Sequence, residues 1–318
     1  METTVYGAPL IEARGVTKHY DGFTLNDVSL AVEPGQIVGF IGQNGAGKST
    51  TIKALLGLIS MDGGEARILG VPACELKGAS SRIKEEVGVV FDTVSVPPHL
   101  TVAEVGRLMA CAYTTWDAAA FERYLGCFKL EGAKAVKGLS RGMGMKLSLA
   151  CALAHSPRVL ILDEATAGLD PMARDEVLDM LREFVAVEDA AGNPQHAILM
   201  SSHITSDLDK IADTVVCIDD GRIVFACDKD EICDLMGVAR CRAAEVEQVL
   251  TSAQAPMEVR VLHHDYGVDL LVPDRFEFMR AFPQIPCDRV SIDDYMALVL
   301  KGTVLHPRDG VQKGGDAR

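Results

Sequence analysis

Short apolar runs alternate with helix-like patterns along the first two thirds of the chain. Alternating apolar and polar residues predict two strands, at 10–20 and 23–32, on either side of a turn at Asp21 and Gly22. Amphipathic patterns predict helices at 48–58, 101–113 and 171–187. Continuous apolar runs predict buried strands that read QIVGFIG (36–42), VGVVF (87–91), RVLILDE (158–164), HAILMSS (196–202) and TVVCIDD (214–220). This order is typical of an α/β fold with a parallel sheet.

The last third of the chain has a different pattern. After about residue 227 the candidate helices and strands become short, and the run SIDDYMALVLKG predicts a final apolar helix. We therefore expect an α/β domain over residues 1–227 and a small α+β extension over residues 228–318.

Composition limits the classes of protein to which this chain can belong. With 318 residues, 48% of them hydrophobic, the chain can bury a substantial core. The formal net charge of −14 argues against a nucleic-acid partner, since binding the phosphate backbone needs Lys and Arg. Neither a membrane span nor a signal peptide is predicted, and the nine cysteines contain no CxxC pair. We expect a cytoplasmic protein.

The strongest chemical signal lies between a predicted strand and a predicted helix. The stretch GFIGQNGAGKSTTIK contains the pattern G-x-x-x-x-G-K-S from Gly42 to Ser49. Glycines let successive backbone N–H groups of such a loop face phosphates; Lys48 supplies a cation, and the Ser49 hydroxyl can bind Mg²⁺. The loop residues expected at the nucleotide are Gly42, Asn44, Gly45, Gly47, Lys48, Ser49 and Thr50.

Two carboxylates, Asp163 and Glu164, end the predicted strand in RVLILDEATAGLD. Ligands of open α/β sheets gather at the carboxyl ends of the strands, so both acids are expected near the phosphate loop. Asp163 would hold the Mg²⁺ shell, and Glu164 would orient or deprotonate an attacking water. By itself, such an acidic pair is also typical of a helix cap.

Two further stretches carry polar residues at the start of predicted helices. In LSRGMGMKLSL (139–149), Ser140 and two glycines open a helix, whose N-terminus offers unpaired N–H groups and a positive dipole end to an anion. This suggests a phosphate. In LMSSHITSDLDKIAD, His203 follows an apolar strand and by itself is typical of a polar loop residue.

Together these stretches resemble the nucleotide-binding subunit of ATP-binding cassette (ABC) transporters, over roughly residues 8–227. GQNGAGKST matches the Walker A motif, LSRGM stands in place of the signature LSGGQ, ILDEATAGLDP matches Walker B with the D-loop, and SSH matches the H-switch. The resemblance implies a P-loop NTPase with a RecA-like core, an antiparallel β subdomain and a helical subdomain at about 92–155 that carries the signature. It also implies an ATPase that hydrolyses ATP with Mg²⁺.

The resemblance also implies roles for single residues. Tyr20 would stack on the adenine, Asp170 would be the D-loop acid, and His203 would sense the γ-phosphate. Glu164, His203 and Lys48 are then the expected catalytic residues. Two subunits of this family pair head to tail, so Ser140 and the N–H of Gly142 would touch a nucleotide held by another chain. For Tyr20, an ordinary core or surface position is the alternative.

Two positions depart from the family pattern. The signature has Arg141 in place of Gly and Met143 in place of Gln, and Arg141 either faces outward or adds positive charge near the phosphates. Asp92 stands where the Q-loop has Gln, whose side-chain oxygen lies near Mg²⁺. Because Asp is shorter and charged, its contact with the metal would need a water bridge or a shift of the loop. The alternative is a solvated Asp92, with another group serving the metal.

The partners implied by the resemblance are a transmembrane permease subunit and a second ATP-binding subunit, identical or different. The permease would hold the chain at the inner face of the cell membrane through a coupling helix. Four residues of the helical subdomain are candidates for that contact or for the core: Pro97, Pro98, Leu100 and Met109. Residues 228–318 resemble the C-terminal extension of bacterial exporter-type ATPases, which would steady the dimer, bind a regulator or cover the sheet.

We therefore predict the ATP-binding and ATP-hydrolysing subunit of an ABC transporter that powers a separate permease, of a bacterial exporter type. The alternative is a soluble ABC-family ATPase with a mechanical or regulatory role. A metabolic P-loop kinase would leave the signature and the H-switch unexplained.

Overall fold

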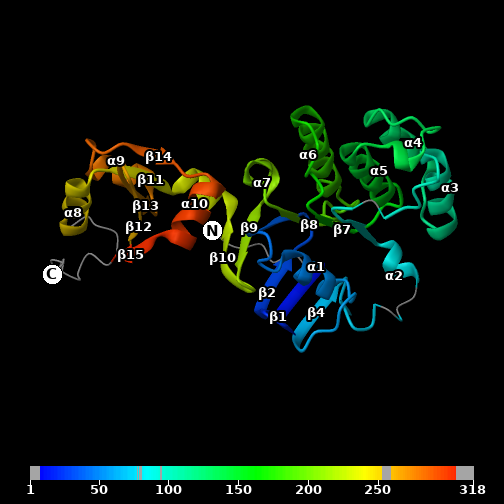
Figure 1. Ribbon diagram of the computed structural model, residues 1–318, viewed down its shortest axis with the longest axis horizontal. Helices are drawn as coiled ribbons and strands as arrows, with labels where there is room; N and C mark the ends of the chain where they lie inside the picture. The colour runs from blue at the N-terminus through cyan, green and yellow to red at the C-terminus, as the bar shows by residue number, and fades with distance from the viewer. Residues whose placement is uncertain (1–7, 77, 79–80, 94, 253–258, 306–318) are drawn as a thin grey trace. The chain divides into compact units, whose positions relative to one another are not determined.

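The computed structural model describes residues 8–305 except 77, 79–80, 94 and 253–258 (Figure 1). The ends of the two expected domains, 1–7 and 306–318, lie outside the described residues. The chain divides into two compact units, Met1–Ala226 and Cys227–Arg318. Within the described ranges, no helix is long and apolar enough to cross a membrane.

A six-stranded sheet with the order β10-β9-β3-β8-β7-β6 forms the centre of the first unit. Its strands are β3 (Ile37–Ile41), β6 (Val87–Val90), β7 (Val159–Asp163), β8 (Ala197–Ser202), β9 (Thr214–Asp219) and β10 (Arg222–Asp228). Every pair from β9 to β6 is parallel, and β3, β7 and β8 are buried along their whole length. The continuous apolar runs of the sequence are therefore interior strands, as predicted.

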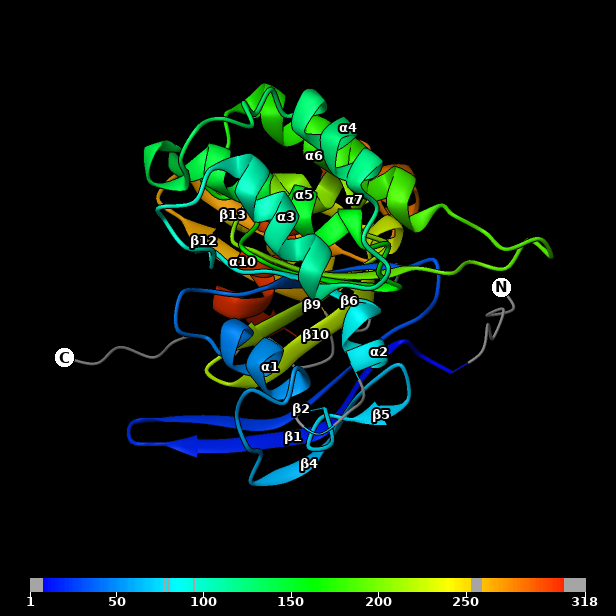
Figure 2. The ribbon, with the colours of Figure 1, turned by 90° about the vertical axis from the view of Figure 1, so that its right-hand side faces the viewer.

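A second, antiparallel sheet has the order β2-β1-β4-β5. Its strands are β1 (Ile11–Tyr20), β2 (Phe23–Val32), β4 (Gly63–Ile68) and β5 (Val71–Pro72). Helix α1 (Lys48–Leu55) lies between the two sheets in Figure 2, and its Ile52 and Leu55 belong to one core with Leu25 and Phe40. Because α1 follows the phosphate loop directly, this shared core holds the loop in place.

The longer of the remaining helices in the first unit lie on the other side of the parallel sheet (Figure 2). They are α3 (Val102–Ala112), α4 (Ala118–Cys127), α5 (Arg141–Ala154), α6 (Pro171–Val185) and α7 (Thr205–Ile211), with the shorter α2 (Ser81–Glu85) and a 3₁₀ turn η1 (Val136–Gly138) nearby in the chain. Side chains of Thr101, Asp117, Ser140 and Asp170 cap four of these helices. The caps satisfy N–H groups that a helix leaves unpaired, and so they set where each helix begins.

The second unit is an α+β fold, as predicted. Six of its elements, from β11 to β14, follow the order βαββαβ. Its sheet has the order β14-β11-β13-β12-β15. Four strands thus have the antiparallel arrangement of a split βαβ, or ferredoxin-like, fold, and β15 adds a fifth. The elements are β11 (Gly237–Cys241), α8 (Ala243–Thr251), β12 (Val259–His264), β13 (Gly267–Val272), α9 (Arg275–Ala281), β14 (Cys287–Arg289), α10 (Ile292–Lys301) and β15 (Thr303–Leu305), preceded by a π-helical turn η2 (Glu231–Leu235).

Alternation along β13 explains how this second unit folds. Val268, Leu270 and Val272 are buried, while the residues between them are partly exposed. The buried face packs with Val246 and Val249 of α8 and Phe278 of α9 into a separate hydrophobic core. The described residues of this unit therefore form a hydrophobic core of their own.

Candidate nucleotide-binding site

The phosphate loop joins β3 to α1. A Cβ at Gly42 would lie 2.2 Å from the carbonyl oxygen of Ile218, so only glycine fits there. Gly47 has φ 119°, a backbone conformation that glycine adopts readily, and its lack of a side chain leaves the start of α1 without a side-chain cap. The first N–H groups of α1 therefore point out of the helix toward an anion site.

Lys48 is buried at the base of this loop. Its Nζ donates to the carbonyl oxygens of Gly42 at 2.7 Å and Gln43 at 3.2 Å, and lies 3.7 Å from Oε1 of Glu164. The ammonium group thus holds the loop in shape. Around it, Ser49 and Thr50 are half-buried in the first turn of α1, while Asn44 and Gly45 are exposed.

The two carboxylates at the end of β7 have different surroundings. Asp163 is buried and pairs in register with Ser201 of β8, whose hydroxyl donates to Oδ1 of Asp163 at 2.6 Å. Glu164 has φ 56°, so the chain turns sharply directly after the strand. Such left-handed backbone in a residue other than glycine is found mostly where the structure needs to aim a side chain.

The Glu164 side chain is aimed at the end of the neighbouring strand. Its Oε2 lies 2.5 Å from Nδ1 of His203 and accepts the His203 backbone N–H at 3.3 Å. The opposite oxygen faces Lys48. The fold therefore brings together Lys48, Glu164 and His203, which are far apart in the sequence.

The signature helix and the D-loop pack against each other. Ser140 caps α5, with its Oγ accepting the N–H of Met143 at 3.3 Å. A Cβ at Gly142 would lie 2.9 Å from the carbonyl oxygen of Gly168, and the Arg141 Cδ is 3.3 Å from where a Cβ of Gly168 would be. The stem of Arg141 thus covers the D-loop, while the residue as a whole stays exposed.

Asp170 begins helix α6. Its Oδ1 accepts the N–H of Ala173 at 3.0 Å, and this bond holds the pKa of the carboxyl below its ordinary value. Ser140 and Asp170 are both exposed, and the only hydrogen bonds that their side chains make within the described residues are to their own helices.

Two predicted residues stand apart from this cluster. Tyr20 ends β1 and is 45% exposed, with Nζ of Lys18 5.8 Å from its ring centroid. Asp92 is exposed after β6, and its carboxylate has no hydrogen-bond or ion-pair partner among the described residues. Among the described residues, no hydrogen bond joins Asp92 to Ser49 or Asp163.

Comparison with known proteins places this geometry in a family. A family model described as ABC transporter matches residues 25–167. The daunorubicin/doxorubicin resistance ATP-binding protein DrrA of Streptomyces peucetius is 31% identical over 300 residues, which cover 90% of this chain and 87% of DrrA. The chain belongs to the ABC transporter family. The Nod factor export ATP-binding protein I of Burkholderia orbicola is 36% identical to this ABC ATPase over 220 residues, or 67% of this chain and 68% of that protein.

Solved structures agree with the fold of this ABC ATPase. A structure of an ATP-binding subunit of an ABC transporter matches with a TM-score of 0.61 and 30% identity, over 70% of this chain and 91% of that one. The dimeric, post-hydrolysis ATP-binding cassette MJ0796 bound to ADP and Pi has a TM-score of 0.59 at 21% identity and supports the fold alone. The predicted P-loop NTPase fold is confirmed by these structures. The predicted ATP binding and ATPase activity are confirmed by membership of the ABC transporter family.

The oxygen donors of this ABC ATPase suit Mg²⁺. Ser49 offers a hydroxyl in the first turn of α1, and Asp163 offers a carboxylate of which one oxygen is occupied by Ser201. Magnesium prefers a few protein oxygens and keeps several waters or substrate oxygens, so a hydroxyl and a carboxylate beside phosphates are a suitable set. The residues present fit the ion.

Sequence reasoning missed the role of Ser201. Its hydroxyl binds Asp163, and its backbone carbonyl accepts the N–H of Glu164 at 3.1 Å. This one residue therefore orients both acids. The signal available in the sequence was the serine pair directly before His203, but only the register between β7 and β8 shows which serine faces the acids.

Proposed function

We propose that this chain hydrolyses ATP at a site shared by two cassettes and thereby powers a separate membrane permease that exports its substrate. The observation that carries the catalytic part is the triangle of Lys48, Glu164 and His203, with Glu164 2.5 Å from His203 and 3.7 Å from Lys48. An acid between a cation and a polarising imidazole is suited to orient and deprotonate a water beside a phosphate.

In the proposed reaction, Lys48, Glu164 and His203 assist a single displacement at the γ-phosphorus of ATP. A water oxygen bonds to the γ-phosphorus while the bond from that phosphorus to the β–γ bridging oxygen breaks, which yields ADP and inorganic phosphate. Glu164 takes the proton of the water, His203 holds Glu164 in place and faces the γ-phosphate, and Lys48 exchanges its loop carbonyls for phosphate oxygens. Ser49 and Asp163 would hold Mg²⁺, which would neutralise charge on the phosphates of ATP. Asp92 would serve the metal either through a water molecule or after a shift of its loop. Tyr20 would stack on the adenine.

The second half of the site would come from another cassette. Ser140, Gly142 and Asp170 lie at the N-termini of α5 and α6. The side chains of Ser140 and Asp170 are exposed, and the bonds that they make to described residues are all within their own helices. An exposed N-cap serine with a free helix N-terminus can receive the γ-phosphate of a nucleotide bound to a partner subunit. A head-to-tail dimer, of two copies or of this chain with a related one, would complete the site.

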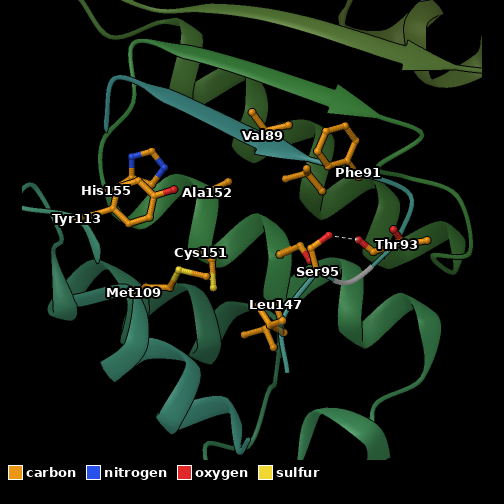
Figure 3. A pocket seen from close by; sticks show the side chains of 13 residues that line it. Val89, Phe91, Thr93, Ser95, Met109, Tyr113, Leu147, Cys151, Ala152 and His155 are labelled. Atoms are coloured by element: carbon orange, nitrogen blue, oxygen red, sulfur yellow. Dashed lines mark hydrogen bonds between the residues drawn. The ribbon is translucent and has the colours of Figure 1, made fainter. Parts of the chain in front are cut away.

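The proposed permease contact is a cavity between β6 and the helices α3 and α5. Its volume is about 200 Å³, and Figure 3 shows Met109, Leu147 and Cys151 on one side of it and Val89 and Phe91 on the other. Met109 was a predicted contact residue, and it does line this cavity; Pro97 and Pro98 are exposed in the loop that precedes α3. An apolar cavity beside the Q-loop can receive a short helix of a membrane subunit and transmit its motion to the site.

Export is proposed from the relatives, whose names refer to Nod factor export and to daunorubicin/doxorubicin resistance. The chain would then lie at the inner face of the membrane, held there by the permease.

The permease can be tested by co-expression with any multi-span membrane protein that is encoded next to this chain, followed by reconstitution in vesicles. ATP turnover should rise when the permease is present. Met109→Lys places a charge in the cavity and should remove that stimulation, whereas Leu108→Lys changes the neighbouring, 45% exposed residue and should keep it. No association and no stimulation would instead favour an ATPase that works without a permease.

A further inference from the structure

Thr166 and Asp207, which are buried, and Arg174, which is partly buried, form a polar cluster in the segments that follow Glu164 and His203. Nε of Arg174 lies 3.7 Å from Oδ1 of Asp207, and its NH2 donates to the carbonyl oxygen of Leu169 at 3.4 Å. Burial raises the pKa of Asp207, and the Thr166 hydroxyl and the Arg174 guanidinium oppose that rise. Arg174 thus links Asp207 to the D-loop carbonyl, while the Thr166 hydroxyl lies near the Asp207 carboxylate without a hydrogen bond of normal geometry to it.

The cluster is poorly satisfied for such a buried position. Asp207 and Thr166 are each 1% exposed. The Thr166 hydroxyl, Nε of Arg174 and Oδ2 of Asp207 are buried and have no hydrogen-bond partner among the described residues. A buried, loosely paired carboxylate and guanidinium stabilise a fold less than apolar side chains of similar size. Fold stability alone therefore explains this cluster poorly.

The placement of its members suggests another role. Thr166 lies in the turn that follows Glu164, Arg174 lies in α6 directly after the D-loop, and Asp207 lies in the first turn of α7, just after His203. Each of the three segments that carry the catalytic carboxylate, the D-loop and the switch histidine thus contributes one member.

We propose that Thr166, Arg174 and Asp207 are positioning residues, which set His203 against Glu164 and tie that geometry to the D-loop. This inference rests on the proposed function of Glu164 and His203. Asp207 anchors the start of α7, and with it the segment that begins at His203, to Arg174. Arg174 in turn holds the Leu169 carbonyl at the D-loop. When the D-loop moves at the partner subunit, these contacts transmit the movement to the Glu164–His203 contact. The buried Nε of Arg174 and Oδ2 of Asp207 have no hydrogen-bond partner among the described residues, so the distance between these two side chains is free to shorten.

The test compares ATP turnover in Asp207→Asn, which keeps the shape of the side chain and removes its charge, with the unmodified full chain. We expect kcat to fall roughly tenfold because a misplaced catalytic group slows the chemical step, while the KM for ATP stays within about twofold. Asp207→Glu keeps the carboxylate and should recover most of kcat. The matched control is Asp175→Asn, which breaks the exposed ion pair between Asp175 and Lys210 that also joins α6 to α7. It should change kcat less than about twofold.

A second measurement separates positioning from simple loss of structure. The same substitution is made in a His203→Ala background, and ATP turnover is assayed at high enzyme concentration. There Asp207→Asn should cause little further loss of kcat, because the cluster acts through His203. An equal fall in both backgrounds, an unchanged kcat in Asp207→Asn, or a KM that rises as much as kcat falls would each overturn the inference. If His203→Ala alone keeps wild-type turnover, the proposed role of His203 fails first.

Arg174→Lys keeps the test decisive if Asp207→Asn does not fold, as judged by its thermal melt. Lysine retains the charge but cannot reach both Asp207 and the Leu169 carbonyl, so kcat should fall severalfold with an unchanged KM. Wild-type kcat in Arg174→Lys would overturn the inference.

Discussion

The candidate site has two halves: a Walker half that includes Lys48 and Asp163, and a signature half that includes Ser140 and Asp170. The side chains of the two halves differ in burial and in their bonding partners. Lys48 and Asp163 are buried and bonded to neighbouring loops and strands of the same chain. Ser140 and Asp170 are exposed, and within the described part of the chain their side chains bond only to their own helices. The first half is therefore held together by contacts between distant segments of one chain, whereas the side chains of the second half remain accessible to another molecule. The difference suggests that the chemistry is prepared within one chain and completed by assembly.

The largest effect is expected inside the Walker half. Glu164→Gln keeps the size and the bond to His203 but removes the base, so ATP hydrolysis should fall at least about a hundredfold while ATP affinity holds. Phosphate release and nucleotide binding measure the two quantities. Glu176→Gln, at an exposed position of α6, is the control. Near wild-type turnover in Glu164→Gln would remove Glu164 from the catalytic role.

Mixing two inactive variants tests whether the halves belong to different chains. Lys48→Ala disables the Walker half, and Ser140→Arg blocks the signature half with bulk, so each homodimer should be inactive. If this chain pairs with itself and the two sites hydrolyse ATP independently, half of the dimers in an equal mixture are mixed and each regains one site of two. The mixture should then recover about a quarter of wild-type activity.

The same question has a structural readout that does not depend on cooperativity. Ser140→Cys combined with Asn44→Cys places a thiol in each half at exposed positions, and a cross-linked dimer should form in the purified chain. The single variants control for the native exposed cysteines, which are Cys74, Cys111 and Cys127. Inactive mixtures without a cross-link would indicate a different partner chain.

A smaller effect is expected at Arg141. Substitutions there separate the contribution of charge from that of packing within the signature half. Arg141→Gln keeps part of the stem over Gly168 and removes the charge, so the KM for ATP should rise about threefold and depend less on salt. Arg141→Gly removes stem and charge together. If only the glycine variant changes KM, the contribution of Arg141 is packing on the D-loop and not charge.

The smallest effect is expected at the Asp170 cap. Asp170→Ala removes the bond to the Ala173 N–H and should lower Tm by about 2–4 °C at pH 7, whereas Asp170→Ser retains a cap and the Tm. Because that bond lowers the pKa of Asp170, its stabilisation is present above the unfolded pKa of about 4 and is lost as the pH falls through the folded value. The Tm difference between wild type and Asp170→Ala should therefore close in acid. A Tm difference that stays constant as the pH falls would show that the ionised carboxylate of Asp170 is not what caps the helix.

Local patterns were enough to predict most elements of the first unit. The continuous apolar runs became β3, β6, β7, β8 and β9 because an interior strand needs apolar residues on both faces. The loop from Gly42 to Ser49 was equally readable, since its glycines and Lys48 act within a few residues of one another. In the second unit the sequence predicted a small α+β fold and the final helix, but not the order of the strands, which depends on pairing between distant segments.

What the sequence determined by itself was therefore the local chemistry: a phosphate loop, two acids after a strand, and a serine that opens a helix. Only the tertiary structure decided which of these groups meet. Adjacent parallel strands β7 and β8 place Ser201 opposite Asp163, and the left-handed backbone of Glu164 turns its carboxylate to His203. The same packing buries Asp207 beside Arg174 and leaves Asp92 exposed. Sequence spacing fixes the backbone over a few residues, whereas contacts between strands and helices depend on register and burial across the whole unit.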